Sequence, residues 1–124
     1  MTENEIQTAI VTHFRKYYEG FIAHVPNGGR RGKLEAMRFK AMGVLPGHPD
    51  LIIYCPKGVF LMEVKEPKKG TLSDNQKKLF PRLQDLGLDL AIVWSIDEAK
   101  RAFMAWGLPR KMPGSASPEL QTGF

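Results

Sequence analysis

The chain has 124 residues, a mass of 14.0 kDa and a formal net charge of +5, so it is large enough for one domain but not for two. No apolar stretch approaches the roughly 20 residues that a membrane-spanning helix needs, and the acidic start of the chain predicts no signal peptide. A single cysteine, Cys55, excludes an internal disulfide and a zinc site built from cysteines, which leads us to expect a cytoplasmic protein.

Lysine and arginine residues gather in two segments of the chain. One segment holds Arg30, Arg31, Lys33, Arg38 and Lys40, and the other holds Lys65, Lys68, Lys69, Lys77 and Lys78. Clustered cations attract phosphate backbones, although solvated surface charge gives the same pattern. The charge therefore suggests a nucleic acid partner without deciding the question.

Residues 2–18 are predicted to form an amphipathic helix. Its apolar face consists of Ile6, Ala9, Ile10, His13, Phe14 and Tyr17, which recur at helical spacing. Thr2 followed three positions later by Glu5 indicates a capping box with Thr2 as the N-cap. A strand is predicted over residues 21–25, and Pro26-Asn27-Gly28-Gly29 then predicts a turn or loop.

A second helix and a hairpin are predicted next. The residues from Lys33 onward are rich in helix formers, and Gly43 is a plausible stop. The connector 45–49 contains two prolines and is not compatible with a helix. The predicted hairpin consists of the strands Leu51–Tyr54 and Val59–Lys65 and the turn Cys55–Gly58.

A third helix is predicted to open with a second capping box, in which Ser73 caps and Gln76 reaches back. Its expected buried stripe is Leu79, Phe80, Leu83 and Leu86. Pro81 interrupts this pattern, so we expect either a kink or a later helix start there. Gly87 is expected to end the helix.

The last predicted elements are a strand and a helix. The apolar run Leu90–Trp94 is typical of a strand buried on both faces, and Ser95 with Glu98 indicates a third capping box. The apolar side of the helix that follows consists of Ala99, Ala102, Phe103 and Trp106. Residues 108–124 have no periodicity and are expected to form a flexible tail. This order of elements predicts an α/β fold in which helices flank a mixed β-sheet.

Three ionisable residues interrupt the apolar strands of the predicted hairpin. Asp50 precedes the first strand, and Glu63 and Lys65 lie two apart on the second, so they project to the same face. Two carboxylates on neighbouring strands can hold a hard cation such as Mg²⁺, and a nearby lysine can assist phosphodiester hydrolysis. The alternatives are a solvent-exposed face for Glu63 and Lys65 and a cap at the start of a strand for Asp50.

The sequence resembles a stand-alone VRR-NUC domain, a branch of the PD-(D/E)xK nuclease superfamily. The matching segments are Glu3-x-x-Ile6-Gln7, Pro26-Asn27-Gly28-Gly29, Gly43-Val44-x-x-Gly47-x-Pro49-Asp50-Leu51, Glu63-Val64-Lys65 and Gly70-x-Leu72-Ser73-x-x-Gln76. The resemblance implies a restriction-endonuclease-like core over residues 1–107 and Mg²⁺- or Mn²⁺-dependent hydrolysis of DNA. It also implies a homodimer similar to Holliday junction resolvases, and it suggests a phage or mobile-element protein.

The resemblance further implies roles for individual residues. Asp50 and Glu63 would bind the metal together with the backbone carbonyl of Val64, and Lys65 would be the catalytic lysine. Gln76 would lie beside the active site, although its role as capping partner of Ser73 is an equal alternative.

Glu3 and Glu5 compete for the carboxylate position of the first helix. Glu3 shares a face with Ile6, Gln7 and Ile10, whereas capping already accounts for Glu5, so we choose Glu3 as a catalytic residue and further metal ligand. Gln7 is then expected to have a supporting role.

The DNA contacts are expected from Asn27, Arg30, Arg31, Lys33, Lys68 and Lys69, against the alternative that residues 27–31 form a plain flexible turn. We expect His13 to belong to the core and His48 to be an exposed loop residue rather than a phosphate contact. Two other functions compete with a dimeric junction endonuclease: a catalytically idle nucleic-acid-binding module and a monomeric nuclease that acts on flapped or nonspecific DNA.

Overall fold

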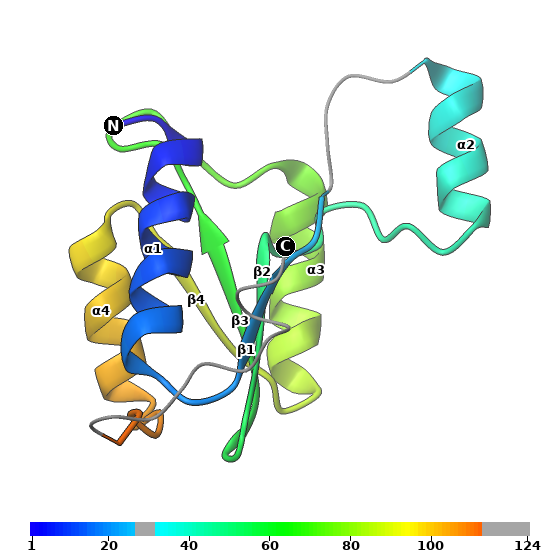
Figure 1. Ribbon diagram of the computed structural model, residues 1–124. Coiled ribbons are helices and arrows are strands. Elements are labelled where there is room, and N and C mark those ends of the chain that lie inside the picture. Colours follow the sequence, from blue (N-terminus) through cyan, green and yellow to red (C-terminus); the bar gives the residue numbers. More distant parts are fainter. Residues whose placement is uncertain (27–31, 113–124) are drawn as a thin grey trace.

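The computed structural model describes residues 1–26 and 32–112. Within them a four-stranded mixed sheet is flanked by helices on both faces, as Figure 1 shows, which confirms the predicted fold class and order of elements. In chain order the elements are α1 (Glu3–Tyr17), β1 (Phe21–His24), α2 (Lys33–Ala41), β2 (Leu51–Cys55), β3 (Gly58–Val64), α3 (Asp74–Asp85), β4 (Asp89–Val93) and α4 (Ile96–Ala105). No helix among the described residues is long and apolar enough to cross a membrane.

The strands follow one another across the sheet in the order β1-β2-β3-β4. β2 pairs antiparallel with both β1 and β3, and β3 pairs parallel with β4 after the chain has passed through α3. Leu51 pairs with Met62, so Asp50 lies beside the end of β3 that carries Glu63. The Lys65 amide donates to the carbonyl of Val93, which extends the parallel ladder to the predicted end of the strand.

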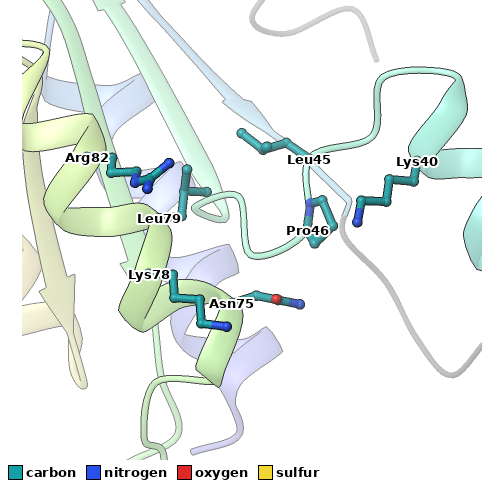
Figure 2. Close-up of a pocket in the computed structure, with 7 residues that line it drawn as sticks. All are labelled: Lys40, Leu45, Pro46, Asn75, Lys78, Leu79 and Arg82. Atoms are coloured by element: carbon teal, nitrogen blue, oxygen red, sulfur yellow. The ribbon is translucent and has the colours of Figure 1, made fainter.

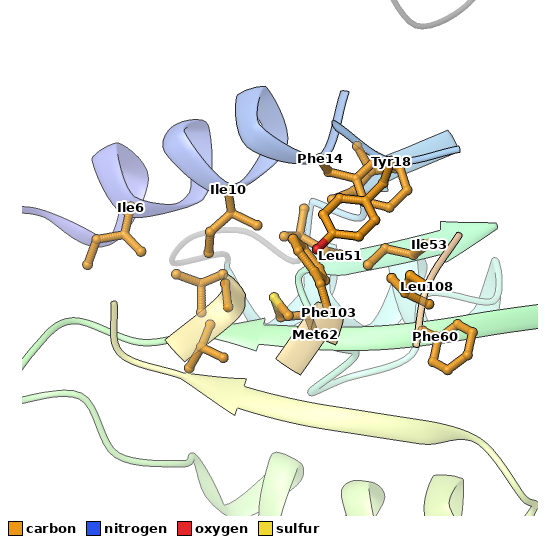
Figure 3. Close-up of a cluster of buried hydrophobic side chains, with 14 residues drawn as sticks. Ile6, Ile10, Phe14, Tyr18, Leu51, Ile53, Phe60, Met62, Phe103 and Leu108 are labelled. Atoms are coloured by element: carbon orange, nitrogen blue, oxygen red, sulfur yellow. The ribbon is translucent and has the colours of Figure 1, made fainter. Parts of the chain in front are cut away.

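The hydrophobic core lies between the sheet and the pair α1 and α4 (Figure 3). Ile10, Phe14 and Phe103 are completely buried there, and the Phe103 ring is 5.2 Å from that of Tyr18. The core side chains of β3 are Phe60, Met62 and Val64. Because successive side chains on a strand point to opposite faces, Leu61, Glu63 and Lys65 project toward the side that α3 covers.

Local capping fixes where α1 and α3 begin. Both predicted capping boxes are present: Thr2 with Glu5, and Ser73 with Gln76, each with the two reciprocal hydrogen bonds. The third differs, because Ser95 caps α4 as predicted but the Glu98 carboxylate accepts from the amide of Trp94, one residue earlier. A carboxylate that reaches past the N-cap still satisfies a backbone donor at the start of the helix.

Four predictions about helix start, burial and order need correction. α3 begins at Asp74 and continues through Pro81, so a later start is wrong, and Leu86 is 78% exposed because it is the C-cap beyond the helix. β4 is not buried on both faces, since it is an edge strand on which only Val93 is buried.

The predicted tail begins too early: Leu108 is buried, and residues 109–111 form backbone hydrogen bonds with the end of α1 and the turn after it. Residues 113–124 lie outside the described part.

Helix α2 stands away from the sheet (Figure 1). It ends near the predicted stop, with Gly43 at a φ of +98°, where glycine has no steric penalty. None of its nine residues, all of which the structure describes, is buried. A helix this short is marginal in water without packing partners.

Candidate active site

Asp50 and Glu63 meet where β2 begins and β3 ends. The Asp50 amide donates to Glu63 Oε1 over 3.2 Å, and the Val64 amide donates to Asp50 Oδ2 over 2.8 Å. Glu63 is only 2% exposed, so it is not on a solvent-exposed face of the strand. The Glu63 carboxylate is thus held by the backbone of Asp50, and the Asp50 carboxylate by the backbone of Val64, in a partly buried position that is costly for charge.

Lys65 and Gln76 complete a hydrogen-bonded cluster around Glu63. Gln76 Nε2 donates to Glu63 Oε2 over 2.8 Å, and Lys65 Nζ donates to Gln76 Oε1 over 2.7 Å. Lys65 Nζ also forms an ion pair with Glu63 Oε2 at 3.2 Å. Gln76 Oε1 accepts from the Ser73 amide as well, so capping and site contact coexist in one side chain.

Glu3 reaches the same place from the first turn of α1. It lines a cleft of about 410 Å³ together with Asp50, Glu63, Lys65 and Gln76. Burial, and then the charge of Asp50, raise the pKa of Glu3, while Lys65 opposes the shift. The structure therefore brings all five predicted catalytic residues to one cleft.

The electrostatics of the cleft are dominated by excess negative charge. Burial first, and then the charge of Asp50, raise the pKa of Glu63 to about 7, although the Lys65 ammonium and the Gln76 amide both act to lower it. The positive charge of one lysine thus does not balance the negative charges of the three neighbouring carboxylates. Such a perturbed acid in a cleft is typical of functional sites.

Two histidines on the rim of the cleft were not expected there. His24 Nδ1 lies 3.0 Å from the carbonyl of Asp50, and His48 Nδ1 lies 2.7 Å from the carbonyl of Pro49. A carbonyl only accepts, so Nδ1 is the protonated nitrogen in both rings. Local sequence carries no signal for the place of His24, because that place depends on the pairing of β1 with β2. His48 is half-buried rather than an exposed loop residue.

The other predicted residues are placed as follows. Glu5 serves the capping box, and Gln7 lines the cleft as a neighbour of Glu3. His13 packs at the margin of the core, where its ring is stacked on Phe103. Lys33, Lys68 and Lys69 are exposed. Asn27, Arg30 and Arg31 lie outside the described residues.

The loop that carries Lys68 and Lys69 is anchored at its far end. The Trp94 indole donates to the carbonyl of Gly70 over 2.8 Å, which agrees with a packing role for this ring rather than a base-stacking one. A Cβ at Gly70 would lie 2.7 Å from the backbone of Glu66, so the loop closes on itself directly after Lys65. These contacts fix the end of β3 from which Lys65 projects.

The sequence matches the model of the VRR-NUC domain over residues 1–95, which is most of the chain. The chain belongs to the VRR-NUC family. VRR-NUC is a nuclease family, and the cleft above is therefore part of a nuclease domain.

Two solved structures share the fold of this VRR-NUC domain. One, described as a VRR_NUC domain protein, is 27% identical with a TM-score of 0.72, over 88% of this chain and 91% of that chain. The other, described as a VRR_NUC domain, is 19% identical with a TM-score of 0.61, over 84% of this chain and 97% of that chain. No curated protein matches the chain.

The acidic pair of this VRR-NUC domain could hold a hard cation. Within residues 1–26 and 32–112, no three His, Cys, Asp or Glu side chains are close enough to hold a metal ion together. Mg²⁺ is commonly held by one or two carboxylates and keeps waters and substrate phosphates as its other ligands. The pair Asp50 and Glu63 matches that requirement; burial and then the charge of Asp50 raise the pKa of Glu63, and a cation would neutralise that charge.

Gly47 keeps the loop before Asp50 against the start of α3. Its φ is +82°, and a Cβ there would lie 2.9 Å from the carbonyl carbon of Asn75 and 3.0 Å from the amide of Gln76. The close approach of these backbones holds the Asp50 and Gln76 sides of the VRR-NUC cleft together.

We expect Gly47→Ala to lower the free energy of unfolding by about 2 to 4 kcal/mol, because it adds a backbone clash to the strain of a positive φ. Gly43→Ala is the matched control, since Gly43 has a φ of +98° but nothing within 4 Å of a Cβ, and it should cost only about 1 kcal/mol. Urea denaturation of both variants measures the difference. Equal losses would show that the contact with α3 contributes nothing.

Glu63→Gln is expected to be more stable than the wild type at pH 8 in metal-free buffer. Because the pKa of Glu63 is raised from 4.5 to about 7, the folded state retains a proton that the unfolded chain has already released. The free energy of unfolding of the wild type therefore falls as the pH rises from 4.5 to 7, and the full cost remains above pH 7. Glutamine avoids this cost, which is roughly 2 to 3 kcal/mol.

Urea denaturation in EDTA at pH 5 and pH 8 tests this expectation. The advantage of Glu63→Gln should be large at pH 8 and small at pH 5. Glu5→Gln provides the control, since hydrogen bonds from Thr2 lower the pKa of Glu5 and a glutamine also completes a capping box. A gain in stability that does not change with pH, or that Glu5→Gln also shows, would contradict the raised pKa of Glu63 as its cause.

Proposed function

We propose that this VRR-NUC domain is a Mg²⁺- or Mn²⁺-dependent endonuclease that cuts Holliday junctions or other branched DNA as a homodimer. The observation that carries the proposal is the convergence of the buried Glu63, whose pKa is raised, and the half-buried Asp50 with one lysine in an open cleft. Such a group is costly to fold around, so it is expected where the charges have a function. The PD-(D/E)xK pattern of Asp50, Glu63 and Lys65 supports the same reaction.

Asp50, Glu63 and the carbonyl of Val64 are the groups that would hold the cation. Glu3, the further ligand predicted from the sequence, lines the same cleft but is not close enough to bind one ion together with both carboxylates, so it would have to move toward them. The cation, when bound, would supply positive charge to the attacked phosphate and lower the pKa of a water molecule. Burial and then the charge of Asp50 raise the pKa values of Glu3 and Glu63, and a cation bound there would relieve the second of these causes.

Lys65 would neutralise charge on the phosphate or orient the attacking water. Its ammonium is held by Gln76 Oε1 and Glu63 Oε2, and its side chain is only 12% exposed, so few orientations are open to it. Gln76 acts through its neighbours: it donates to Glu63 and accepts from Lys65, and its backbone is fixed by the cap of α3. We therefore regard Lys65 as catalytic and Gln76 as a positioning residue.

Helix α2 supports the dimeric part of the proposal. Leu34, Met37 and Met42 are 78%, 60% and 76% exposed, on or next to a helix without buried residues. Large exposed apolar side chains of this kind mark interaction sites. A second copy would cover them, and two sites related by symmetry could cut the two strands of a junction.

Cleavage of labelled DNA by the full chain tests the proposal. Four-way, flapped and linear duplex DNA are incubated with Mg²⁺, Mn²⁺ or EDTA, and we expect metal-dependent nicking that is fastest on branched DNA and absent from Glu63→Gln. Sedimentation analysis with and without junction DNA decides whether the active species is a dimer. Metal-independent binding without cleavage would instead identify an idle nucleic-acid-binding module.

A further inference from the structure

A second depression adjoins the cleft on the side of α3. It is a groove of about 510 Å³ between α3 and the chain that leaves α2 (Figure 2). Its lining residues are Lys40, Leu45, Pro46, Asn75, Lys78, Leu79 and Arg82. None of them belongs to the five-residue site or to the sequence-predicted DNA contacts.

The charge of the groove has one sign. Lys40, Lys78 and Arg82 line it, and none of its lining residues is acidic. Within the described residues the ion pair joins Lys65 to Glu63, and none of the three groove cations forms a salt bridge with a carboxylate there. Unpaired cations on both walls make the groove complementary to a polyanion.

The groove also has apolar lining residues on both sides. Leu45 is 44% exposed and Leu79 is half-buried, and Figure 2 shows Leu79 beside Arg82 on α3, with Leu45 and Pro46 on the chain that leaves α2. A nucleic acid strand presents phosphates on one side and the flatter surfaces of sugars and bases on the other. A groove lined by both cations and apolar side chains matches both of these surfaces.

The groove lies next to the catalytic cleft. Gly47 packs on Asn75 and the Gln76 amide; Asn75 lines the groove, whereas Gln76 lines the cleft. Arg82 lies six residues beyond Gln76 in α3, which is about 9 Å along the helix axis. That length corresponds to between two and three nucleotides of a B-form strand.

We propose that this groove binds the sugar–phosphate backbone of the DNA strand that leads into the cleft. Lys78 and Arg82 are four residues apart on α3 and therefore lie on one face, where they contact successive phosphates, and Lys40 contacts the strand from the opposite wall. This inference rests on the proposed function, because it gives the nuclease site a track for its substrate. The contacts are to the backbone, so they set register and affinity rather than base sequence.

The test measures binding separately from cleavage. A fluorescein-labelled four-way junction is titrated with the full chain in EDTA at several salt concentrations, and the double variant Lys78→Gln with Arg82→Gln is compared with the wild type. Loss of two phosphate contacts should weaken binding about tenfold and reduce the slope of log K against log salt by about 1.4 to 1.8. Lys40→Gln should reduce the slope by about half as much.

The control is the double variant Lys100→Gln with Arg101→Gln, which removes the same charge from exposed positions on α4. It should retain the wild-type slope, and Lys78→Arg should retain most of the affinity. If the two double variants weaken DNA binding equally, the groove proposal is overturned, because only the net charge of the protein would then determine affinity. Unchanged DNA binding with an altered sedimentation coefficient also overturns it, and assigns the groove to a protein partner.

The outcomes also separate this inference from the proposed function. If binding in EDTA depends on the groove residues but no cleavage occurs in Mg²⁺ or Mn²⁺, the endonuclease proposal is contradicted and the groove proposal is supported. If cleavage depends on the metal but the affinity for DNA is the same with and without Lys78 and Arg82, the groove proposal is contradicted and the endonuclease proposal is supported.

Discussion

Lys65→Met is expected to reduce the rate of metal-dependent DNA cleavage by about two to three orders of magnitude. The substitution keeps the apolar stem of the side chain but removes the ammonium that bonds to Gln76 and Glu63. The attacked phosphate then loses a fixed positive charge. Glu63 loses the group that most strongly lowers its pKa, so it retains a proton to higher pH.

Single-turnover cleavage of a labelled junction measures the rate, and titration in EDTA measures the affinity. We expect the rate to fall while affinity changes little, since Lys65 is one mostly buried cation among many exposed ones. Lys100→Met removes an equal charge from exposed α4 and should leave the rate as it is. Equal losses of rate and affinity in Lys65→Met would identify a binding residue and contradict a catalytic role.

Phe103→Ala is expected to lower the free energy of unfolding by about 3 to 5 kcal/mol. Phe103 is completely buried between the sheet and α1, and its ring lies 5.2 Å from Tyr18 and 5.7 Å from Phe14 in edge-to-face contacts. The cavity left by the ring would remove these contacts together with the apolar burial. The free energy of unfolding of a small domain is only about 5 to 15 kcal/mol in total, so this loss brings the variant close to unfolding.

Urea denaturation gives the size of this loss. Met104→Ala is the matched control, because Met104 is the next residue of α4 and is 69% exposed, and it should change stability by less than about 0.5 kcal/mol. Since α1 packs on Phe103 and also carries Glu3, the folded fraction of Phe103→Ala should show weakened cleavage as well. A loss of stability no larger than that of Met104→Ala would contradict the central position of this ring.

Features that depend on neighbours in the chain were predictable. Glu63 and Lys65 share a face because side chains alternate along a strand, and that inference needed only their spacing. Thr2 with Glu5 and Ser73 with Gln76 were recognised as capping boxes because every partner lies within one turn. Helical periodicity also favoured Glu3 over Glu5 for the cleft, and the structure places them accordingly.

Features that depend on distant parts of the chain were not predictable. His24 reaches Asp50 only through the register of β1 on β2, which the sequence does not encode locally. Leu86 and β4 were expected to be buried because they are apolar, but burial depends on what lies beside an element, and β4 is at an edge of the sheet. The sequence could not decide whether Gln76 caps α3 or contacts the site, and in the structure its one side-chain amide does both.

The cleft combines parts of unequal rigidity. Glu63 lies in β3, which is paired on both sides, and its amide should be among the slowest to exchange with solvent. Glu3 and Gln76 belong to the first turns of α1 and α3, and terminal turns are where helices open most readily. Each opening of either first turn would withdraw a side chain from the cleft while Glu63 stays in place. The two caps at Thr2 and Ser73 therefore set the fraction of time for which the site is assembled.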